Sequence, residues 1–261
     1  MQHKLCLSIE KPANLDLIDA TAQDELIESN TQQETKVINK YVDSYAAAIA
    51  GLQDGHCLMV GGFGSAGLPA GLLHAVLDHG TRDLVVVSNN AGFDREGVAL
   101  LIAAGRVRKL ICSYPLTEGA TAFRDAYRDK KIELELVPQG TLAERIRCAG
   151  AGLGGFLSPI GVGTMLAEGK PVYHHEGRDY VIETPLQADF ALLKARAADR
   201  YGNLTYHLTG RNFNPLMATA ADVVAVEVDE FVELGQLEPE NVVTPGIFAD
   251  RIVLTHKETT V

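Results

Sequence analysis

The feature that most constrains the fold of this chain is a glycine-rich turn between an apolar run and a helical pattern. The apolar run extends from Cys57 to Val60, glycines follow at positions 61, 62, 64 and 67, and Pro69 opens a helical pattern that ends at His79. Proline suits the first turn of a helix because its missing N–H would have no partner there. The stretch therefore predicts a strand, a glycine loop and a helix in succession.

Two kinds of ligand are compatible with this loop. Glycine lets a ligand approach the bare backbone, and free N–H groups at the start of a helix attract anions, so we expect a ligand that carries phosphate. Residues 62–67 also match the G-x-G-x-x-G fingerprint of dinucleotide-binding proteins, which would indicate an NAD-dependent oxidoreductase. That fingerprint needs an acidic residue at the end of the next strand, whereas the predicted strand Leu84–Val87 runs into Ser88-Asn89-Asn90. The mismatch disfavours a dinucleotide and leaves the oxidoreductase as an alternative.

Composition and charge narrow the class of protein. The chain has 261 residues, of which 46% are hydrophobic, so it can bury a sizeable core in one large domain or two small ones. Its 23 basic and 34 acidic residues give a net charge of −11, which repels nucleic acid and anionic lipid. No apolar stretch approaches the ~20 residues that span a bilayer, and the N-terminus lacks the layout of a secretory signal. We expect a cytoplasmic protein with no nucleic-acid or membrane partner.

Cysteine, histidine and serine offer no pattern typical of a metal site or of a catalytic triad. The chain contains four cysteines and no C-x-x-C pair, so we expect reduced thiols that act as small apolar side chains. His174-His175 lies in a polar hairpin without a third ligand at zinc spacing, and we expect no metal. Ser65 lies in the glycine loop, but no G-x-S-x-G motif is present, which disfavours serine hydrolysis.

Residues 1–38 differ in composition from the rest of the chain. They are rich in glutamine, asparagine and threonine and carry seven acidic residues against three lysines. Such a segment cannot bury enough apolar surface to offset the entropy lost on ordering. We therefore expect an acidic, flexible extension over residues 1–38 and a single domain over residues 39–261.

Strand-like and helix-like patterns alternate after the glycine loop. They follow one another in the order Leu84–Val87, Glu96–Ala104, Lys109–Ser113, Thr121–Asp129 and Ile132–Val137. This alternation predicts an α/β fold, with a mostly parallel sheet covered by helices. Thr141 and Glu144 match a capping box, which predicts that the next helix begins after Thr141.

A second glycine-rich segment separates two halves of the chain. Residues 149–169 hold seven glycines, and a loop of this length is typically functional or part of an interface, with a flexible surface loop as the alternative. Beyond it, strand patterns follow at Tyr180–Glu183, Phe190–Lys194, Leu204–His207 and Val223–Val228, and we expect these strands to form a sub-domain on the same sheet.

Polar residues follow the predicted strands of the first half, where an α/β sheet places its ligands. Asn89, Asn90 and Gln139 carry neutral amides, which can hold a carboxylate or a developing oxyanion without neutralising a nearby catalytic acid. Asn90-Ala91-Gly92 and Gln139-Gly140 also have the chemistry of simple turns, which is the alternative. The polar, rigid stretch 211–215 suits either a capped turn or an interface.

Several long motifs follow one another in a fixed order along the chain. The first comprises Asp54-Gly55, the apolar Leu58-Met59-Val60, Gly61-Gly62-Phe63 and Gly67-x-Pro69. The others are Ser88-Asn89-Asn90-Ala91-Gly92, Val137-Pro138-Gln139-Gly140-Thr141-Leu142, the segment 149–169, Gly202-Asn203-Leu204, Arg211-Asn212-Phe213-Asn214-Pro215 and Thr244-Pro245-Gly246. Together they resemble the first (α, or A) subunit of the family I coenzyme A transferases. The resemblance covers about residues 39–253.

The resemblance implies the α/β fold of that family and ping-pong transfer of coenzyme A (CoA) between carboxylic acids. A CoA thioester would be a substrate, with no permanently bound cofactor. The nucleophilic glutamate of the family belongs to the β subunit, so this chain would be half of an enzyme, in a heterodimer or a tetramer with two copies of each chain. The residues that match the CoA-binding loop are Gly61, Gly62, Phe63, Gly64, Ser65, Ala66 and Gly67. Gln139 matches an amide that supports the oxyanion, and Asn89 and Asn90 match amides of the acid pocket.

The resemblance also gives an expectation for the acid. Ile146-Arg147-Cys148, Gly154-Gly155-Phe156-Leu157 and Leu204-Thr205-Tyr206 are most similar to the short-chain type, so we expect acetoacetate or acetate. The α subunit of a 3-oxoadipate CoA-transferase is the alternative, because such enzymes share most of the other motifs. A non-catalytic assembly or regulatory protein with the same fold is a further alternative.

Overall fold

The computed structural model describes residues 38–94, 96–116 and 120–255. The described residues from Asn39 to Thr255 form one compact unit. The acidic extension predicted over residues 1–38 lies outside the described residues, apart from Ile38. Among the helices described, none is long and apolar enough to cross a membrane.

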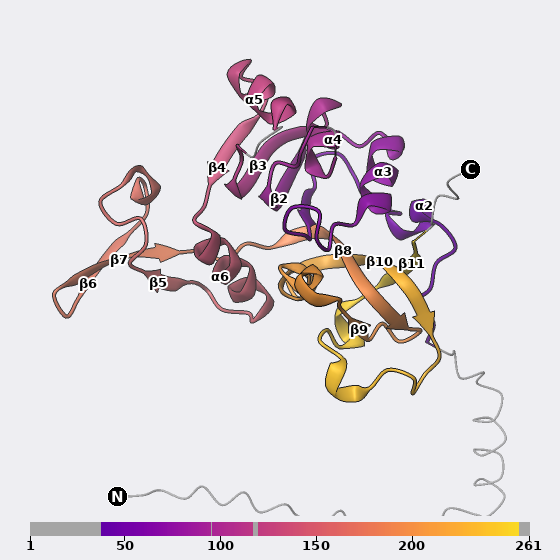
Figure 1. The fold of residues 1–261 in the computed structure, drawn as a ribbon. Helices are drawn as coiled ribbons and strands as arrows, with labels where there is room; N and C mark the ends of the chain where they lie inside the picture. Colours follow the sequence, from indigo (N-terminus) through magenta and orange to yellow (C-terminus); the bar gives the residue numbers. More distant parts are fainter. Residues whose placement is uncertain (1–37, 95, 117–119, 256–261) are drawn as a thin grey trace, which may run out of the picture. The chain divides into compact units, whose positions relative to one another are not determined.

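A parallel sheet forms the centre of this unit (Figure 1), which confirms the predicted α/β class. Its strands lie in the order β11-β10-β8-β1-β2-β3-β4, and each is parallel to its neighbours. The short strand β9 pairs antiparallel with β8. The bounds are β1 Cys57–Val60, β2 Leu84–Asn90, β3 Val107–Tyr114, β4 Glu133–Leu136, β8 Ala188–Asp199, β9 Leu204–Thr205, β10 Ala221–Val232 and β11 Arg251–Leu254.

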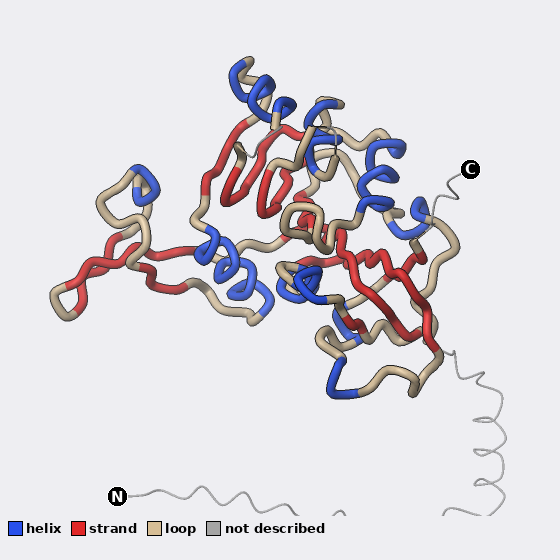
Figure 2. Tube along the Cα trace, viewed as in Figure 1, coloured by secondary structure: helices blue, strands red, loops and turns tan. Residues whose placement is uncertain are grey.

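Helices cover both faces of the sheet (Figure 2), because alternate strand residues point to opposite faces and both sets are apolar. On β1, Leu58 and Val60 join one core cluster and Met59 joins the other. The first cluster packs against helices α2 (Tyr45–Ala48), α3 (Ala70–His79), α4 (Val98–Ala103) and α5 (Thr121–Arg128). The second packs against α6 (Gln139–Gly150) and α7 (Asn214–Ala218). The result is a three-layer sandwich.

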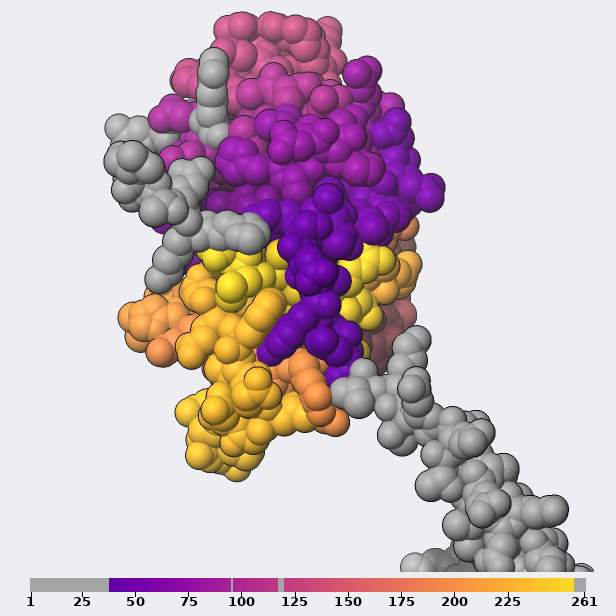
Figure 3. Space-filling model, turned by 90° about the vertical axis from the view of Figure 1, so that its right-hand side faces the viewer, coloured from indigo at the N-terminus to yellow at the C-terminus, as the bar shows by residue number. Residues whose placement is uncertain are grey.

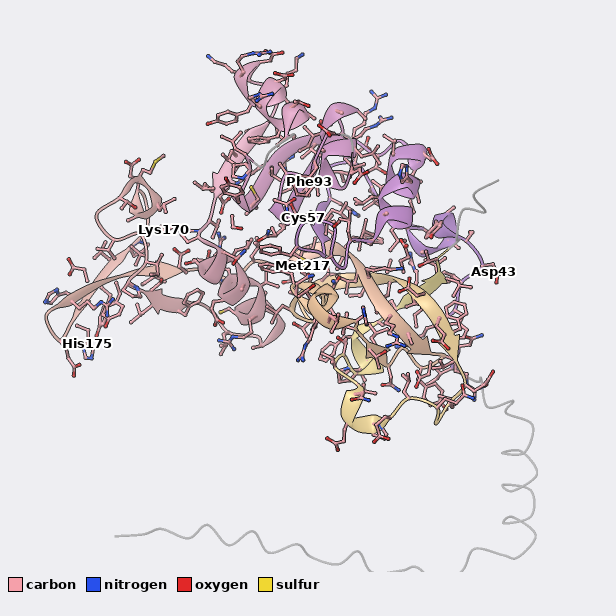
Figure 4. All side chains as sticks on the ribbon, in the orientation of Figure 1. Asp43, Cys57, Phe93, Lys170, His175 and Met217 are labelled. Atoms are coloured by element: carbon pink, nitrogen blue, oxygen red, sulfur yellow. The ribbon has the colours of Figure 1, made fainter. Side chains whose placement is uncertain are left out.

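A three-stranded antiparallel sheet lies apart from the main one, and we call residues 151–187 the arm. Its strands are β5 (Phe156–Ser158), β6 (Val172–His175) and β7 (Arg178–Glu183), in the order β5-β7-β6. Figure 4 labels Lys170 and His175 on the arm, which extends beyond α6. The expectation that residues 180–183 join the main sheet is therefore wrong. A turn at residues 176–177 brings β7 back alongside β6. The backbone N–H and C=O groups of β7 therefore pair within the arm and not with the main sheet.

The first described residues lie along the last strand of the sheet. The Val42 N–H donates to Ile252 O (2.9 Å) and the Ile252 N–H donates to Lys40 O (2.8 Å). Figure 3 shows this indigo segment against the yellow residues near the C-terminus. The start of the compact unit is thus held by β11.

Several boundaries differ from the sequence prediction, and two of these differences matter for the site. Strand β2 continues to Asn90, so the asparagines belong to the strand. Helix α6 begins at Gln139, because the Leu142 N–H donates to Pro138 O (2.8 Å) and closes a helical turn there. The predicted capping box is wrong, since Thr141 is buried inside the helix.

Candidate functional site

The carboxyl ends of β1 and β8 form a switch point in the sheet. The chain leaves β1 towards β2 on one side, and leaves β8 towards β10 on the other side. Diverging connections leave a crevice between two strand ends, which is where open α/β sheets bind ligands. The glycine loop (residues 61–67) follows β1, and residues 200–213 follow β8. The two segments meet at this crevice.

A small pocket of about 20 Å³ lies beside the glycine loop, between the loops that follow β1 and β2. It is lined by Val60, Gly61, Gly62, Gly64, Ser65, Leu68, Ser88, Asn89, Asn90, Gly92, Phe93, Glu96, Gly97 and Val98. Figure 4 labels Phe93 in this region. Glu96 is the only charged residue among these lining residues. Among the described lining residues, uncharged polar groups therefore come from the backbone, from the hydroxyls of Ser65 and Ser88 and from the amides of Asn89 and Asn90.

The glycine loop has a tight turn at its tip. The Phe63 N–H donates to Ala66 O (3.0 Å) and the Ala66 N–H donates to Phe63 O (3.2 Å). The two tip residues are Gly64 and Ser65, and neither N–H has an acceptor among the residues that the structure describes. These two N–H groups are free to bind an anion or a carbonyl oxygen.

The start of helix α3 is occupied by a carboxylate of the protein itself, in contrast to the sequence prediction of free N–H groups there. Glu227 on β10 is 3% exposed and accepts from the N–H groups of Gly71 (2.8 Å) and Leu72 (3.3 Å). Lys194, its register partner on β8, lies 3.4 Å from the same carboxylate. A buried anion on the helix dipole, paired with a cation, satisfies these donors. The loop tip, rather than the helix start, offers donors to a ligand.

Two glycines of the loop are required by close packing. A Cβ at Gly61 would collide with the side-chain amide of Asn214, and a Cβ at Gly67 would collide with Gly210 O. Gly67 also has a positive φ of 67°. These two positions therefore let the loop lie directly against the segment that follows β8.

A chain of polar groups joins the ends of β2 and β3 to helix α6. Asn89 is 4% exposed, and its Oδ1 accepts from Ser113 Oγ (3.0 Å) and from Gln139 Nε2 (2.7 Å). Gln139 is the first residue of α6 and its side chain is exposed. Asn89 thus fixes one amide hydrogen of Gln139 and leaves the other without a partner in the described chain. The structure brings together Asn89 and Gln139, as the sequence led us to expect.

Asn90 lies both in a local turn and in the lining of the pocket, which were the two interpretations that the sequence left open. Its Oδ1 accepts from the Gly92 N–H (2.9 Å), which is the geometry of a local turn, and the residue also lines the pocket. For Gln139-Gly140 the interpretation as a turn is wrong, since both residues lie in the first turn of α6.

A repeat that the sequence reasoning missed encloses the pocket. Gly62-Phe63-x-x-x-Gly67 after β1 recurs as Gly92-Phe93-x-x-x-Gly97 after β2. In both copies the phenylalanine backbone pairs with the residue three positions later, Ala66 or Glu96. The Phe93 ring lies 3.9 Å from the position of a Cβ on Gly64. Comparing the residues after the two strands would have found this signal.

Two cysteines of the main sheet have thiols with raised pKa values. Burial raises the pKa of Cys57 to about 11 and the pKa of Cys112 to about 12. A thiol with such a pKa carries almost no thiolate at neutral pH and is a poor nucleophile. In the described ranges, no three His, Cys, Asp or Glu side chains are grouped as metal ligands.

Comparisons with known proteins agree with the motifs. A family model described as Coenzyme A transferase matches residues 42–255. The α (A) subunit of the 3-oxoadipate CoA-transferase of Pseudomonas putida is 54% identical over 83% of this chain and 94% of its own length. The α subunit of the acetate CoA-transferase of Escherichia coli K12 is 48% identical over 78% of this chain and 92% of its own length.

Solved structures share the fold. Glutaconate coenzyme A-transferase from Acidaminococcus fermentans superposes with a TM-score of 0.73 at 20% identity, over 83% of this chain and 75% of that one. An acyl-CoA transferase from Escherichia coli O157:H7 gives a TM-score of 0.75 at 22% identity, over 84% of this chain. The alignment spans only 47% of the Escherichia coli chain, so this chain corresponds to about half of it.

Proposed function

We propose a function from the premise that this chain belongs to the coenzyme A transferase family. The chain is the α subunit of an enzyme that moves CoA between an acyl-CoA and a short-chain or 3-oxo carboxylic acid. Because the chain belongs to this family, we no longer consider an NAD-dependent oxidoreductase. In addition, the end of β2 carries asparagines at the position where a dinucleotide-binding protein has an acidic residue that binds the ribose.

The observation that carries the proposal is the hydrogen bond from Gln139 Nε2 to Asn89 Oδ1 (2.7 Å), because Asn89 lines the pocket beside the glycine loop. Gly64 and Ser65, whose N–H groups are free, line the same pocket. The loop tip would bind the CoA thioester through these donors. The second amide hydrogen of Gln139 would stabilise the oxyanion that forms when the thioester carbonyl is attacked.

The nucleophile would come from the β subunit, as the family resemblance implies. Its glutamate would attack the acyl carbonyl and release the CoA thiolate, which would then attack the glutamyl carbonyl of the mixed anhydride and release the first acid. The glutamyl-CoA thioester that remains would transfer CoA to the second acid by the reverse of these steps. The pocket of this chain supports that division, because Glu96 is the only carboxylate that lines it and no described group activates a nucleophile there. This chain then contributes binding and oxyanion support, and the partner contributes the covalent step.

Three acids are candidates for the physiological acceptor, namely acetoacetate, acetate and 3-oxoadipate. The sequence motifs favoured acetoacetate or acetate, and the acetate enzyme of Escherichia coli is 48% identical. The 3-oxoadipate enzymes of Pseudomonas putida and Acinetobacter baylyi are 54% and 50% identical, and the succinyl-CoA:3-ketoacid enzyme of Xanthomonas campestris is 46% identical. A 3-oxo acid is common to two of these three types, so we propose a 3-oxo acid as the acceptor.

Reconstitution tests the proposal. The chain is purified with its β subunit, and CoA transfer from succinyl-CoA is measured with 3-oxoadipate, acetoacetate and acetate at equal concentrations. The expected result is transfer by the pair and none by either chain alone, with a 3-oxo acid preferred to acetate. Transfer by this chain alone would overturn the divided site, and an acetate preference would overturn the proposed acceptor.

A further inference from the structure

We infer that Asn212 and Asn214 are positioning residues that hold the glycine loop in its ligand-binding shape. They belong to the motif 211–215, for which the sequence left a turn and an interface as open interpretations. The inference rests on the proposed function, because it assigns the held loop to binding of the CoA thioester.

Asn212 joins the two sides of the loop. Its Oδ1 accepts from the Gly62 N–H (3.1 Å) on the incoming side, and its Nδ2 donates to Ala66 O (2.9 Å) on the outgoing side. The same amide also bonds within its own segment, to Thr209 O (2.8 Å) and the Phe213 N–H (2.7 Å). One side chain therefore ties the entry and the exit of the loop to the connection that follows β8.

Asn214 anchors this arrangement to the sheet. It is fully buried, its Oδ1 accepts from the Lys194 N–H of β8 (3.0 Å), and its Nδ2 donates to Gly67 O (3.1 Å). The same Nδ2 also donates to Gly210 O (2.9 Å). Since a Cβ at Gly61 or Gly67 would collide here, the loop lies as close to this segment as a backbone can.

These bonds leave the tip of the loop available to a ligand. The asparagines bind the loop at residues 62, 66 and 67, whereas Gly64 and Ser65, the two residues with free N–H groups, are not among their partners. A glycine-rich loop without such ties would sample many conformations, and the ligand would have to order it. The two asparagines therefore act on binding of the thioester through the loop and need not touch the ligand.

The test compares Asn212→Ala with a matched control, Asn203→Ala, in the complex with the β subunit. Asn203 also bridges two segments, donating to Asp199 Oδ2 (2.8 Å) and accepting from the Gly246 N–H (2.9 Å), but it makes no bond to the glycine loop. We expect Asn212→Ala to raise KM for succinyl-CoA about tenfold, because the variant loses the two hydrogen bonds between Asn212 and the glycine loop. KM for the acid should stay unchanged, and amide exchange over residues 62–68 should accelerate about tenfold.

The control and a conservative variant keep the inference falsifiable. Asn203→Ala should leave KM for succinyl-CoA and exchange in the loop unchanged. Asn212→Asp retains the acceptor for the Gly62 N–H, so its KM for succinyl-CoA and its rate of exchange in the loop should lie between those of the wild type and of Asn212→Ala. If Asn212→Ala does not assemble with the β subunit, Asn212→Asp is used in its place. Equal rises in KM for Asn212→Ala and Asn203→Ala would overturn the inference, as would normal exchange in the loop of Asn212→Ala. If the wild-type complex transfers no CoA, the proposed function fails, and the exchange measurement alone still decides whether Asn212 holds the loop.

Discussion

In the glycine loop, glycine is required where any larger residue would collide with a neighbouring segment. In residues 149–169, by contrast, most glycines have open space where a side chain would lie. Gly61 and Gly67 pack directly against Asn214 and Gly210. Four of the seven glycines in the second segment have no other group within 4 Å of a built Cβ, namely Gly152, Gly154, Gly163 and Gly169. Two segments with similar composition therefore differ in where close packing requires glycine. In the second segment it does so at Gly150, against Thr219, and at Gly155, against Glu183 O, and not at the four open positions.

Helix α6 joins these two regions. Its first residue, Gln139, lies in the candidate site, and Arg145 in its middle holds the root of the arm by donating to Thr184 O (2.9 Å). The Leu186 N–H donates in turn to Arg145 O (3.0 Å). Substitutions along one helix can therefore separate effects on catalysis from effects on the arm.

The largest expected effect is that of Gly61→Ala. The new methyl group would collide with the buried Asn214 amide, so Asn214 or the loop must move. Overpacking of this kind costs about 3 kcal/mol of the free energy of unfolding. Thermal unfolding should show a midpoint lowered by about 6–12 °C, and CoA transfer should be lost. An unchanged midpoint would contradict the packing role that we assign to Gly61.

The next effect in size is kinetic and belongs to Gln139→Ala. Loss of one donor to a developing oxyanion typically lowers kcat by about 10²–10³. KM for the acyl-CoA and the unfolding midpoint should stay near the wild-type values, because the Gln139 side chain is exposed and makes a single described bond. A wild-type kcat would remove Gln139 from the catalytic machinery and would favour a non-catalytic role for the chain.

A smaller effect, dependent on pH, is expected at Glu135 on strand β4, which pairs with Arg145 of α6. Burial alone would raise the pKa of Glu135, but hydrogen bonds and charges from Arg145 (2.8 Å) and Lys109 (2.6 Å) outweigh it and hold the pKa below its ordinary value. A lowered folded-state pKa stabilises the protein above the unfolded pKa of about 4.3, and this contribution is lost as pH falls through the folded value.

Glu135→Gln tests that contribution. At pH 7 it should lower the free energy of unfolding by about 1 kcal/mol, a value reduced by solvent screening of a partly exposed group. The difference from the wild type should shrink as pH falls below about 4. Denaturant titrations at pH 7 and pH 3.5 measure it, and a difference that is constant with pH would contradict the ion-pair account.

The smallest effect is expected for Gly154→Ala, the counterpart of Gly61→Ala. Gly154 is exposed, has open space around it and does not have a left-handed φ. The free energy of unfolding should change by less than about 0.5 kcal/mol, or rise slightly because alanine restricts the unfolded chain. A loss of unfolding free energy as large as that expected for Gly61→Ala would contradict the distinction between the packed glycine loop and the open positions of residues 149–169.

Sequence periodicity predicted the parallel α/β class and the strands around the glycine loop, and it pointed to two candidate residues that the structure brings into contact. The apolar run 57–60, the glycine loop and the helix from Ala70 were predictable because each is a local pattern, and Asn89 and Gln139 were found because they follow predicted strands. The links that the sequence could not show are long-range. Glu227 caps a helix that lies more than 150 positions earlier, and Asn212 binds a loop at a similar separation. Both depend on β8 and β10 returning beside β1, which no local pattern encodes.

The most direct test of the account is to identify which of the two chains carries the covalent intermediate. The assembled complex is incubated with acyl-CoA without an acceptor acid, and the intact mass of each chain is measured. The account predicts a mass increase of one CoA, less water, on the β subunit, with no change on this chain. A CoA adduct on this chain, at Glu96 or any other carboxylate, would contradict the claim that it supplies the binding loop and Gln139 while its partner supplies the nucleophile.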